Sequence, residues 1–285
     1  MQPARRKIVF GLPAALAFNP QFALAGAKKF RLGLTPVFLN NDREVLDATQ
    51  KYIQEYIGGQ IEFVQRRTYE EITNLLLLGD LDAAWICGYP YLQHKDDLSV
   101  VAVPVWRGAA LYQAYTIVGS DSTAKHWEDL RGGLHAYSDP DSNSGYLVTV
   151  SELIRRNHKP ETFFERTIFT FGHRNVVRAV ASRLTDSGSV DGYVWEALSK
   201  IEPELTTGTR VIWKSEKLGF PPIACRKELA ATDEMQAFRK ALFEMHKNDT
   251  GKTILDQLQI DKFQHGEEQL FDGIAARMKI LADRA

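Results

Sequence analysis

Strand-like and helix-like segments alternate along most of the chain, and this alternation is what most limits the possible folds. The strand-like runs lie at 28–37, 60–67, 81–88 and 98–106, and the helix-like stretches between them at 41–58 and 68–80. The second helix-like stretch opens with Thr68 and Glu71 in the spacing of a capping box. Alternation of this kind is typical of an α/β fold in which helices cover mainly parallel sheets.

Two extended segments, near 111–121 and 210–228, interrupt this pattern. Between them lies a second series of alternating strand and helix patterns. A chain that leaves one lobe, builds another and then returns forms two lobes with a ligand cleft between them. We therefore expect one lobe from residues 28–115 and 218–285, and a second lobe from 116–217.

The N-terminus reads as an export signal rather than as part of the fold. Its first seven residues carry three positive charges, an apolar run follows, and Ala23-Leu24-Ala25 supplies the small residues of a cleavage site. The apolar run is too short to cross a bilayer comfortably. No cysteine follows the small residues, so lipid attachment is not expected. The pattern predicts a signal peptide at 1–25 and a mature protein free in a bacterial periplasm.

The composition excludes several classes of protein. The chain has 285 residues with 44% hydrophobic and 25% charged content, which is ordinary for a soluble globular protein. No basic stripe indicates a nucleic-acid partner. Loss of the signal peptide leaves 32 basic and 36 acidic residues. This small net negative charge neither attracts nor strongly repels an anion, so any anion site must be formed by local groups. No enzyme, metal or cofactor motif is present, and we expect a monomeric binding protein without a cofactor.

The chain has two cysteines, Cys87 and Cys225. In an exported protein they could form a disulfide. The sequence alone cannot place their Cα atoms within the distance that a disulfide requires. The pairing therefore stays open at this point.

Candidate ligand-binding residues follow from the expected strand ends, because ligands of open α/β sheets bind beyond the carboxyl ends of strands. In the first lobe these ends fall near Thr35 and Cys87, and in the second lobe near Ser138, His173 and Asp191. The resulting candidates are Thr35, Cys87, Tyr89, Ser142, Asn143, Ser144, His173, Asp191 and Tyr193.

The strongest local pattern is Ser142-Asn143-Ser144-Gly145 at the start of a helix. A helix N-terminus presents free N–H groups and a partial positive charge, and it binds phosphate-like anions. The hydroxyls can add donors, and the glycine lets backbone approach a ligand closely. The alternative interpretation is that Ser138, Asp139 or Asp141 simply caps the helix and that the rest is a turn. His173 has the alternative of an ordinary surface histidine, and the tyrosines that of core residues.

Four segments, in this order, resemble one family: GDLDAAWICGYPYL (79–92), DLRGGLHAYSDPDSNSGYL (129–147), FGHRNVVRAVA (171–181) and SVDGYVWEAL (189–198). The chain resembles the phosphonate/phosphite/phosphate-binding periplasmic proteins of ABC importers over roughly residues 30–260. This resemblance implies the two-lobe type II periplasmic binding protein fold. It also implies an ABC permease as partner.

The resemblance further implies roles for particular residues. The family holds its oxyanion with Ser-Thr-Ser at a helix N-terminus, which matches 142–144 here, with Asn143 in place of threonine. A lobe-one aromatic matches Tyr89, a lobe-two histidine matches His173, and the segment from Asp191 to Glu196 corresponds loosely. Asparagine is bulkier than threonine and brings both a donor and an acceptor, so the exact ligand is left open.

The sequence thus favours a component that captures phosphonate, phosphite or phosphate for an ABC importer. The second hypothesis is a periplasmic sensor that reports ligand status to a membrane histidine kinase. Some relatives of this family resemble such sensors and bind arsenite, for which Cys87 would be a soft ligand. The alternative for Cys87 is a small buried hydrophobe. An enzyme using Cys87 and His173 as nucleophile and base is a third hypothesis.

Overall fold

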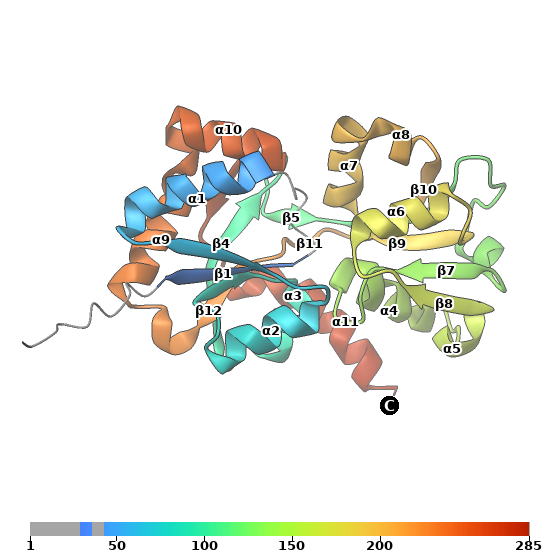
Figure 1. Cartoon of the computed structure of the whole chain (residues 1–285). Helices are drawn as coiled ribbons and strands as arrows, with labels where there is room; N and C mark the ends of the chain where they lie inside the picture. The colour runs from blue at the N-terminus through green and yellow to red at the C-terminus, as the bar shows by residue number, and fades with distance from the viewer. Residues whose placement is uncertain (1–28, 36–42, 285) are drawn as a thin grey trace, which may run out of the picture.

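The computed structural model describes residues 29–35 and 43–284. The expected signal peptide, residues 1–25, lies outside the described residues. Figure 1 shows two lobes side by side, each with a central sheet and helices packed around it, and two short strands between them. The α/β architecture expected from the sequence is confirmed. Within the described ranges, no helix is both long enough and apolar enough to cross a membrane.

The described part of the first lobe has a sheet of six strands in the order β13-β4-β12-β3-β1-β2. These strands are β1 (Phe30–Leu34), β2 (Ile61–Gln65), β3 (Ala83–Trp85), β4 (Leu98–Val105), β12 (Ile223–Arg226) and β13 (Lys262–Gln264). The helices are α1 (Arg43–Ile57), α2 (Tyr69–Leu78), α3 (Gly88–Gln93), α9 (Asp233–Glu244) and α10 (Asp249–Leu258). The expected capping box of α2 is present, because Thr68 Oγ1 accepts from the Glu71 N–H and the Glu71 carboxylate accepts from the Thr68 N–H.

The described part of the second lobe has a sheet of five strands in the order β10-β6-β9-β7-β8. These strands are β6 (Ala114–Gly119), β7 (Leu134–Tyr137), β8 (Arg166–Phe169), β9 (Ser187–Asp191) and β10 (Thr209–Lys214). The helices are α4 (Val148–Arg155), α5 (Pro160–Phe163), α6 (His173–Ala181), α7 (Gly192–Ile201) and α8 (Pro203–Thr206). A π-helical turn, η2 (Asn143–Leu147), leads directly into α4.

Both sheets are mixed, which corrects the expectation of mainly parallel sheets. β1 pairs in parallel with β2 and β3, and β7 pairs in parallel with β8 and β9. Strands that come from the connecting segments run the other way: β12 is antiparallel to β3 and β4, and β6 is antiparallel to β9 and β10. A segment that arrives from the other lobe is not part of a strand-helix-strand unit, so nothing restricts it to the parallel direction.

The two lobes are connected through a separate antiparallel pair, β5 (Leu111–Tyr112) and β11 (Leu218–Gly219). The single strand expected over 111–121 is therefore divided, because the chain leaves β5 at Gln113 and enters the second sheet as β6. We propose the lobe division given by the sequence, 28–115 with 218–285 and 116–217. It agrees with the sheets except that β6 begins at Ala114.

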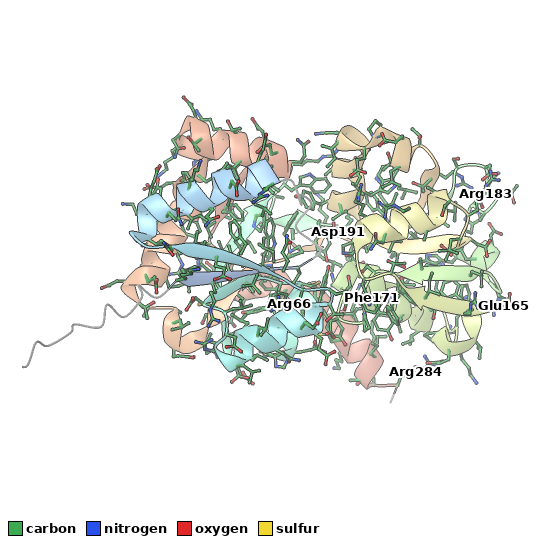
Figure 2. The ribbon with its side chains drawn as sticks, in the orientation of Figure 1. Arg66, Glu165, Phe171, Arg183, Asp191 and Arg284 are labelled. Atoms are coloured by element: carbon green, nitrogen blue, oxygen red, sulfur yellow. The ribbon has the colours of Figure 1, made fainter. Side chains whose placement is uncertain are left out.

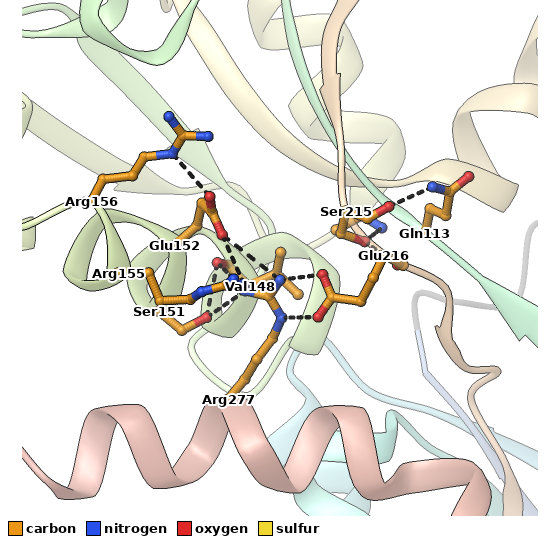
Figure 3. A network of polar contacts seen from close by, with 10 residues as sticks. Gln113, Val148, Ser151, Glu152, Arg155, Arg156, Ser215, Glu216 and Arg277 are labelled. Carbon is orange, nitrogen blue, oxygen red and sulfur yellow. Dashed lines mark hydrogen bonds and ion pairs between the residues drawn. The ribbon is translucent and has the colours of Figure 1, made fainter.

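The C-terminal helix α11 (Asp272–Ala282) packs against α4 of the second lobe as well as α3 of the first. Its Arg277 is 2% exposed. Arg277 Nε donates to Glu216 in the returning connection at 2.8 Å, and Nη1 donates to Ser151 of α4 at 2.8 Å (Figure 3). Burial opposes ionisation of Glu216, but the hydrogen bonds and charge of Arg277 hold its pKa below the ordinary value. Through Arg277, helix α11 thus links the returning connection at Glu216 to helix α4.

The main cluster of buried apolar side chains runs through both lobes without a break. Where the lobes meet, the rings of Tyr112 and Tyr193 both pack on Phe220, with centroid distances of 5.6 and 5.0 Å. Trp106 adds an edge contact to Tyr193 at 5.9 Å. The lobes are therefore in direct apolar contact beside the residues that the sequence singles out.

Candidate functional site

Four chain segments bring polar residues to the boundary between the lobes. In the first lobe, Cys87 follows β3 and immediately precedes α3. In the second lobe, η2 follows β7, His173 begins α6, and Asp191 ends β9. Each of these positions lies at the carboxyl end of a strand or the amino end of a helix, which is where open α/β sheets bind ligands. These residues therefore lie where the sequence places them, near strand ends, and their binding of a ligand stays a prediction.

The serines at the start of η2 have different roles. Ser142 Oγ accepts a hydrogen bond from the Gly145 N–H at 3.0 Å, so Ser142 is the helix cap. Ser144 Oγ is buried near the Tyr112 hydroxyl but has no partner of hydrogen-bond geometry among the described residues. Gly145 is needed for packing, because a Cβ there would lie 1.8 Å from Ser138 Oγ. The cap is thus Ser142 and not Ser138, Asp139 or Asp141, while the Ser144 hydroxyl has no hydrogen-bond partner among the described residues.

Asn143 connects the two lobes. Its backbone N–H donates to Cys87 Sγ at 3.2 Å, and its Nδ2 donates to the Tyr112 hydroxyl at 2.8 Å. Because Tyr112 accepts this bond, its own O–H proton remains available for a second partner. Asn143 Oδ1 is buried without a hydrogen-bond partner in the described part of the chain. Asn143 therefore presents an acceptor next to the donor of Tyr112.

His173 orients a second phenol. Its Nδ1 accepts from the Asp191 backbone N–H at 3.1 Å, and its Nε2 lies 3.2 Å from the Tyr69 hydroxyl. Burial lowers the pKa of His173 to about 3, so the ring is neutral at neutral pH. A neutral ring that accepts at Nδ1 carries its proton on Nε2 and donates it to Tyr69. The Tyr69 hydroxyl can then donate its own proton to a ligand.

Asp191 completes the group from the second lobe. One carboxylate oxygen, Oδ1, caps α7 by accepting from the N–H groups of Tyr193 and Val194 at 2.8 and 3.3 Å. The other oxygen, Oδ2, is buried and has no hydrogen-bond partner among the described residues. Burial raises the pKa of Asp191 to about 7. Figure 2 shows Asp191 on the side of the second lobe that faces the first.

We call these residues the interlobe cluster: Tyr69, Cys87, Tyr112, Asn143, Ser144, His173 and Asp191. Each of them is at most 2% exposed. Burial raises the pKa of Cys87 to about 12, and it also raises the pKa values of Tyr69 and Tyr112, so these groups are protonated. The cluster contains hydroxyl donors, amide and carboxyl acceptors and a thiol, but no lysine or arginine.

Two guanidinium groups near the lobe boundary, those of Arg107 and Arg174, are paired elsewhere, whereas that of Arg67 lies over the Phe171 ring, 4.5 Å from its centroid. Arg107 Nη2 donates to Glu196 at 3.1 Å, and Arg174 Nε donates to Glu202 at 2.8 Å, both at exposed positions. A ligand in the interlobe cluster would thus be held by neutral donors and by the positive end of the η2–α4 helix. This arrangement suits a small, tetrahedral or trigonal oxyacid of low charge.

Three predicted site residues lie beside the cluster rather than in it. Tyr89 packs, half-buried, against Tyr69 and Cys87. Thr35 Oγ1 donates to the Trp85 carbonyl at 2.8 Å. The Tyr193 hydroxyl donates to the Leu258 carbonyl at 2.5 Å, across the lobe boundary. Because the hydroxyls of Thr35 and Tyr193 donate to backbone carbonyls, we assign these two residues a structural role.

Sequence reasoning missed Tyr69 and Tyr112. Tyr69 is the first residue of α2, directly after the capping threonine, and α2 follows the carboxyl end of β2. Applying the strand-end rule to β2 would have found it. Tyr112 lies in β5, the connection between the lobes. Its signal is weaker: residues in a connecting segment of a two-lobe protein lie next to the cleft.

The structure also settles the state of the two cysteines. Cys87 and Cys225 are both buried, free thiols, so the pairing that the sequence left open is not formed. In the described ranges, no three histidine, cysteine, aspartate or glutamate side chains gather in a way that could hold a metal ion.

Comparisons with known proteins agree on one family. Residues 32–271 match the family model described as "ABC transporter, phosphonate, periplasmic substrate-binding protein". The chain is 28% identical over 213 residues to the phosphonates-binding periplasmic protein of Escherichia coli (strain K12), covering 72% of this chain and 62% of that protein. The match spans about three fifths of the length of the curated relatives.

Solved structures agree with the fold. A binding protein component of an ABC phosphonate transporter from Pseudomonas aeruginosa superposes with a TM-score of 0.79 at 23% identity, covering 88% of this chain and 86% of that one. A protein from Prochlorococcus marinus (MIT 9301), solved in complex with methylphosphonate, superposes with a TM-score of 0.78 at 18% identity, covering 90% and 98%. At these identities the structures show the type II periplasmic binding protein fold.

Proposed function

The chain belongs to the family of phosphonate-binding periplasmic proteins of ABC transporters, a family of binding proteins rather than enzymes, and from this premise we propose that it captures a small phosphonate-class oxyanion in the interlobe cluster. The class includes phosphonates, phosphite and phosphate. The observation that carries the proposal is the buried start of η2 and α4, where Ser144 Oγ and Asn143 Oδ1 have no protein partner among the described residues. Buried polar atoms are normally hydrogen-bonded, so a ligand accounts for them.

Binding between the lobes explains the residues on both sides. Tyr69 and Tyr112 reach the cluster from the first lobe, and η2 and His173 reach it from the second. A ligand held by donors from both lobes stabilises the closed arrangement relative to an open one, because only the closed form makes all the contacts. This coupling is what an ABC permease would detect, and we propose a permease as the partner.

We further propose that the protein is exported and acts in the periplasm. The support is the charged, apolar and small-residue pattern of residues 1–25. Expression in a Gram-negative host followed by osmotic shock should release a protein whose N-terminus lies just after Ala25, as read by mass spectrometry. An intact Met1 on the released or membrane-bound protein would contradict export by this signal.

The binding proposal is tested on the purified mature protein. Thermal denaturation should be measured in the presence of phosphate, phosphite or methylphosphonate. Calorimetry should then give the dissociation constants. A ligand at a hundred times its dissociation constant stabilises the folded state by roughly 2.7 kcal/mol. Absence of both a thermal shift and binding heat for all three compounds would reject the proposal.

A second candidate is a periplasmic arsenite sensor for a membrane histidine kinase. The favouring observation is the position of Cys87, whose thiol lies within the cluster at hydrogen-bond distance from Asn143. Arsenous acid is neutral near pH 7, and the cluster contains no positively charged side chain that would favour an anion over it. The thiol of Cys87 would displace one hydroxyl of arsenous acid: the As–S bond forms as the As–O bond breaks, and the thiol proton leaves with that hydroxyl as water. Arsenite binding by the reduced protein, without a response to phosphate or phosphonates, would favour this candidate.

A further inference from the structure

The C-terminal helix α11 begins against the first lobe. Ile274 in its first turn is fully buried, and a Cβ on Gly88 would lie 2.6 Å from Ile274 Cδ1. Phe271, the residue just before the helix, packs on Tyr91 of α3 with a centroid distance of 5.0 Å. Gly88 is the first residue of α3 and directly follows Cys87. The start of α11 therefore rests on a segment that carries part of the interlobe cluster.

The rest of α11 is anchored in the second lobe. The buried guanidinium of Arg277 donates to the Val148 carbonyl at 3.2 Å, and Figure 3 shows it reaching α4 from α11. Leu281 packs against the apolar cluster of the second lobe. Arg284, just beyond the helix, makes two hydrogen bonds to Glu161 of α5, at 3.1 and 2.7 Å. Because α4 continues directly from η2, this part of α11 rests on the helix that carries the candidate oxyanion site.

One helix thus holds both lobes, and a rotation of the lobes must change one set of contacts. A helix of this length is a rigid rod of about 16 Å, so it cannot follow both lobes at once. Separation from the second lobe would remove buried partners from the Arg277 guanidinium, which is costly. Separation from the first lobe exposes only a small apolar contact. The contact between Ile274 and Gly88 is therefore the one that opening should break.

We propose that α11 is a further connection between the lobes, besides the β5–β11 pair, and that its contact with Gly88 stabilises the closed form. Ile274 is then a positioning residue, which acts through Gly88 and not on the ligand. A ligand that binds only the closed form has an apparent dissociation constant that rises as the closed fraction falls. The inference goes beyond the proposed function, because it concerns the lobes with or without a ligand.

Ile274→Val tests the contact directly, because it removes the Cδ1 methyl group that lies over Gly88. In calorimetry with methylphosphonate, we expect a dissociation constant up to about fivefold higher than that of the wild type, in line with the usual cost of this substitution in a core. Small-angle X-ray scattering of the ligand-free variant should show a larger radius of gyration. Excess methylphosphonate should restore the wild-type radius.

Ile53→Val is the matched control. Ile53 is 1% exposed and lies in α1, which packs on α9, α10 and β2 of the first lobe. The control loses the same methyl group, so its stability in urea should fall by a similar amount. Its dissociation constant and its ligand-free radius of gyration should equal those of the wild type, because these elements move together as one lobe.

Gly88→Ala adds a test by double substitution. Its Cβ would lie 2.6 Å from Ile274 Cδ1, so it should push α11 away from α3 and weaken methylphosphonate binding about tenfold. In the Gly88→Ala background, Ile274→Val removes the clashing methyl group and should therefore improve binding instead of weakening it. Two independent effects on the fold would instead give losses that add.

The outcomes separate this inference from the proposed function. Equal dissociation constants and equal scattering for Ile274→Val and Ile53→Val would overturn the inference and leave the proposed function intact. If phosphate, phosphite and methylphosphonate all fail to bind the wild type, the proposed function is wrong, and the ligand-free radius of gyration alone decides the role of α11. An increase in Ile274→Val but not in Ile53→Val then supports the inference, and equal values reject it.

Discussion

Cys87 Sγ in the first lobe accepts a hydrogen bond of 3.2 Å from the backbone N–H of Asn143 in the second. This contact joins the end of β3 to the first residue of η2, so the helix start that would bind an oxyanion is also a point where the lobes meet. A ligand at this helix start therefore lies against both lobes at once. Changes in the cluster should accordingly affect ligand affinity and lobe closure together.

The two serines of η2 should separate binding from stability. Ser142→Ala removes the cap of the Gly145 N–H and should lower the free energy of unfolding by about 1 kcal/mol. Ser144→Ala removes a hydroxyl without a protein hydrogen bond, so it should leave stability nearly unchanged and weaken oxyanion binding by about 1.5–3 kcal/mol. Urea denaturation and calorimetry with methylphosphonate measure the two effects. Equal affinity of Ser144→Ala and the wild type would exclude this hydroxyl from the site.

Tyr69→Phe should weaken binding because the phenol is oriented as a donor by His173. Loss of a hydrogen bond to a charged ligand costs about 1.5–3 kcal/mol of binding free energy. The control is Tyr91→Phe. The ring of Tyr91 packs on Phe271 outside the cluster, so removal of its hydroxyl should leave affinity unchanged. Calorimetry with methylphosphonate decides the matter, and similar losses in both variants would contradict a specific role for Tyr69.

Cys87 should distinguish the two candidate functions. Cys87→Ser keeps a small polar side chain in the same place but removes the soft ligand that arsenite requires. If the protein is an importer component, the reduced wild type and the variant should bind methylphosphonate equally and ignore arsenite. Arsenite binding that is present in the wild type and lost in the variant would establish the sensor instead.

Stability should fall on acidification, with a slope that depends on Asp191. Burial lowers the pKa values of His135 and His173 to about 3, so between about pH 6.5 and 4 the unfolded chain binds protons that the folded chain does not. Asp191 works in the opposite direction, because its raised pKa of about 7 means that the folded state is already protonated while the unfolded state is not.

Asp191→Asn removes that opposing contribution. Between pH 6 and pH 5 its free energy of unfolding should fall more steeply than that of the wild type, by about 1.4 kcal/mol per pH unit. Urea denaturation at both pH values measures the difference. Parallel pH profiles would show that Asp191 has the same pKa in the folded and unfolded states.

The parts of the structure that the sequence predicts well are those set by local patterns. The capping box of Thr68 and Glu71 and the strand ends near Cys87 and at Asp191 follow from residue type and spacing. For Gly145 the sequence predicts close approach to a ligand, whereas in the structure its missing side chain leaves room for Ser138. The split between β5 and β6, the mixed sheets and the presence of Tyr69 and Tyr112 in the cluster depend on how distant segments meet. Tyr193 shows the same limit, because its hydroxyl is occupied by the carbonyl of Leu258, a residue 65 positions away.

The ion pair between Arg277 of α11 and Glu216 of the returning connection should also contribute to the free energy of unfolding. Arg277 is nearly fully buried, and Glu216 is its main charged partner, with Glu152 farther away at 3.9 Å. Glu216→Gln leaves the guanidinium buried with less compensation, and breaking a buried ion pair typically costs about 3 kcal/mol of unfolding free energy. Glu216 is 47% exposed, so water offsets part of that loss and we expect about 2 kcal/mol.

An exposed ion pair provides the control for this last prediction. Arg183, labelled at the edge of the second lobe in Figure 2, pairs with Asp121. Both side chains are more than half exposed. Surface pairs contribute little, so Arg183→Gln should leave the unfolding midpoint in urea unchanged within error. Glu216→Gln should lower that midpoint, because Arg277 keeps its bonds to Ser151 and Val148 but loses its carboxylate. A midpoint equal to that of Arg183→Gln would mean that α11 is held by apolar packing alone.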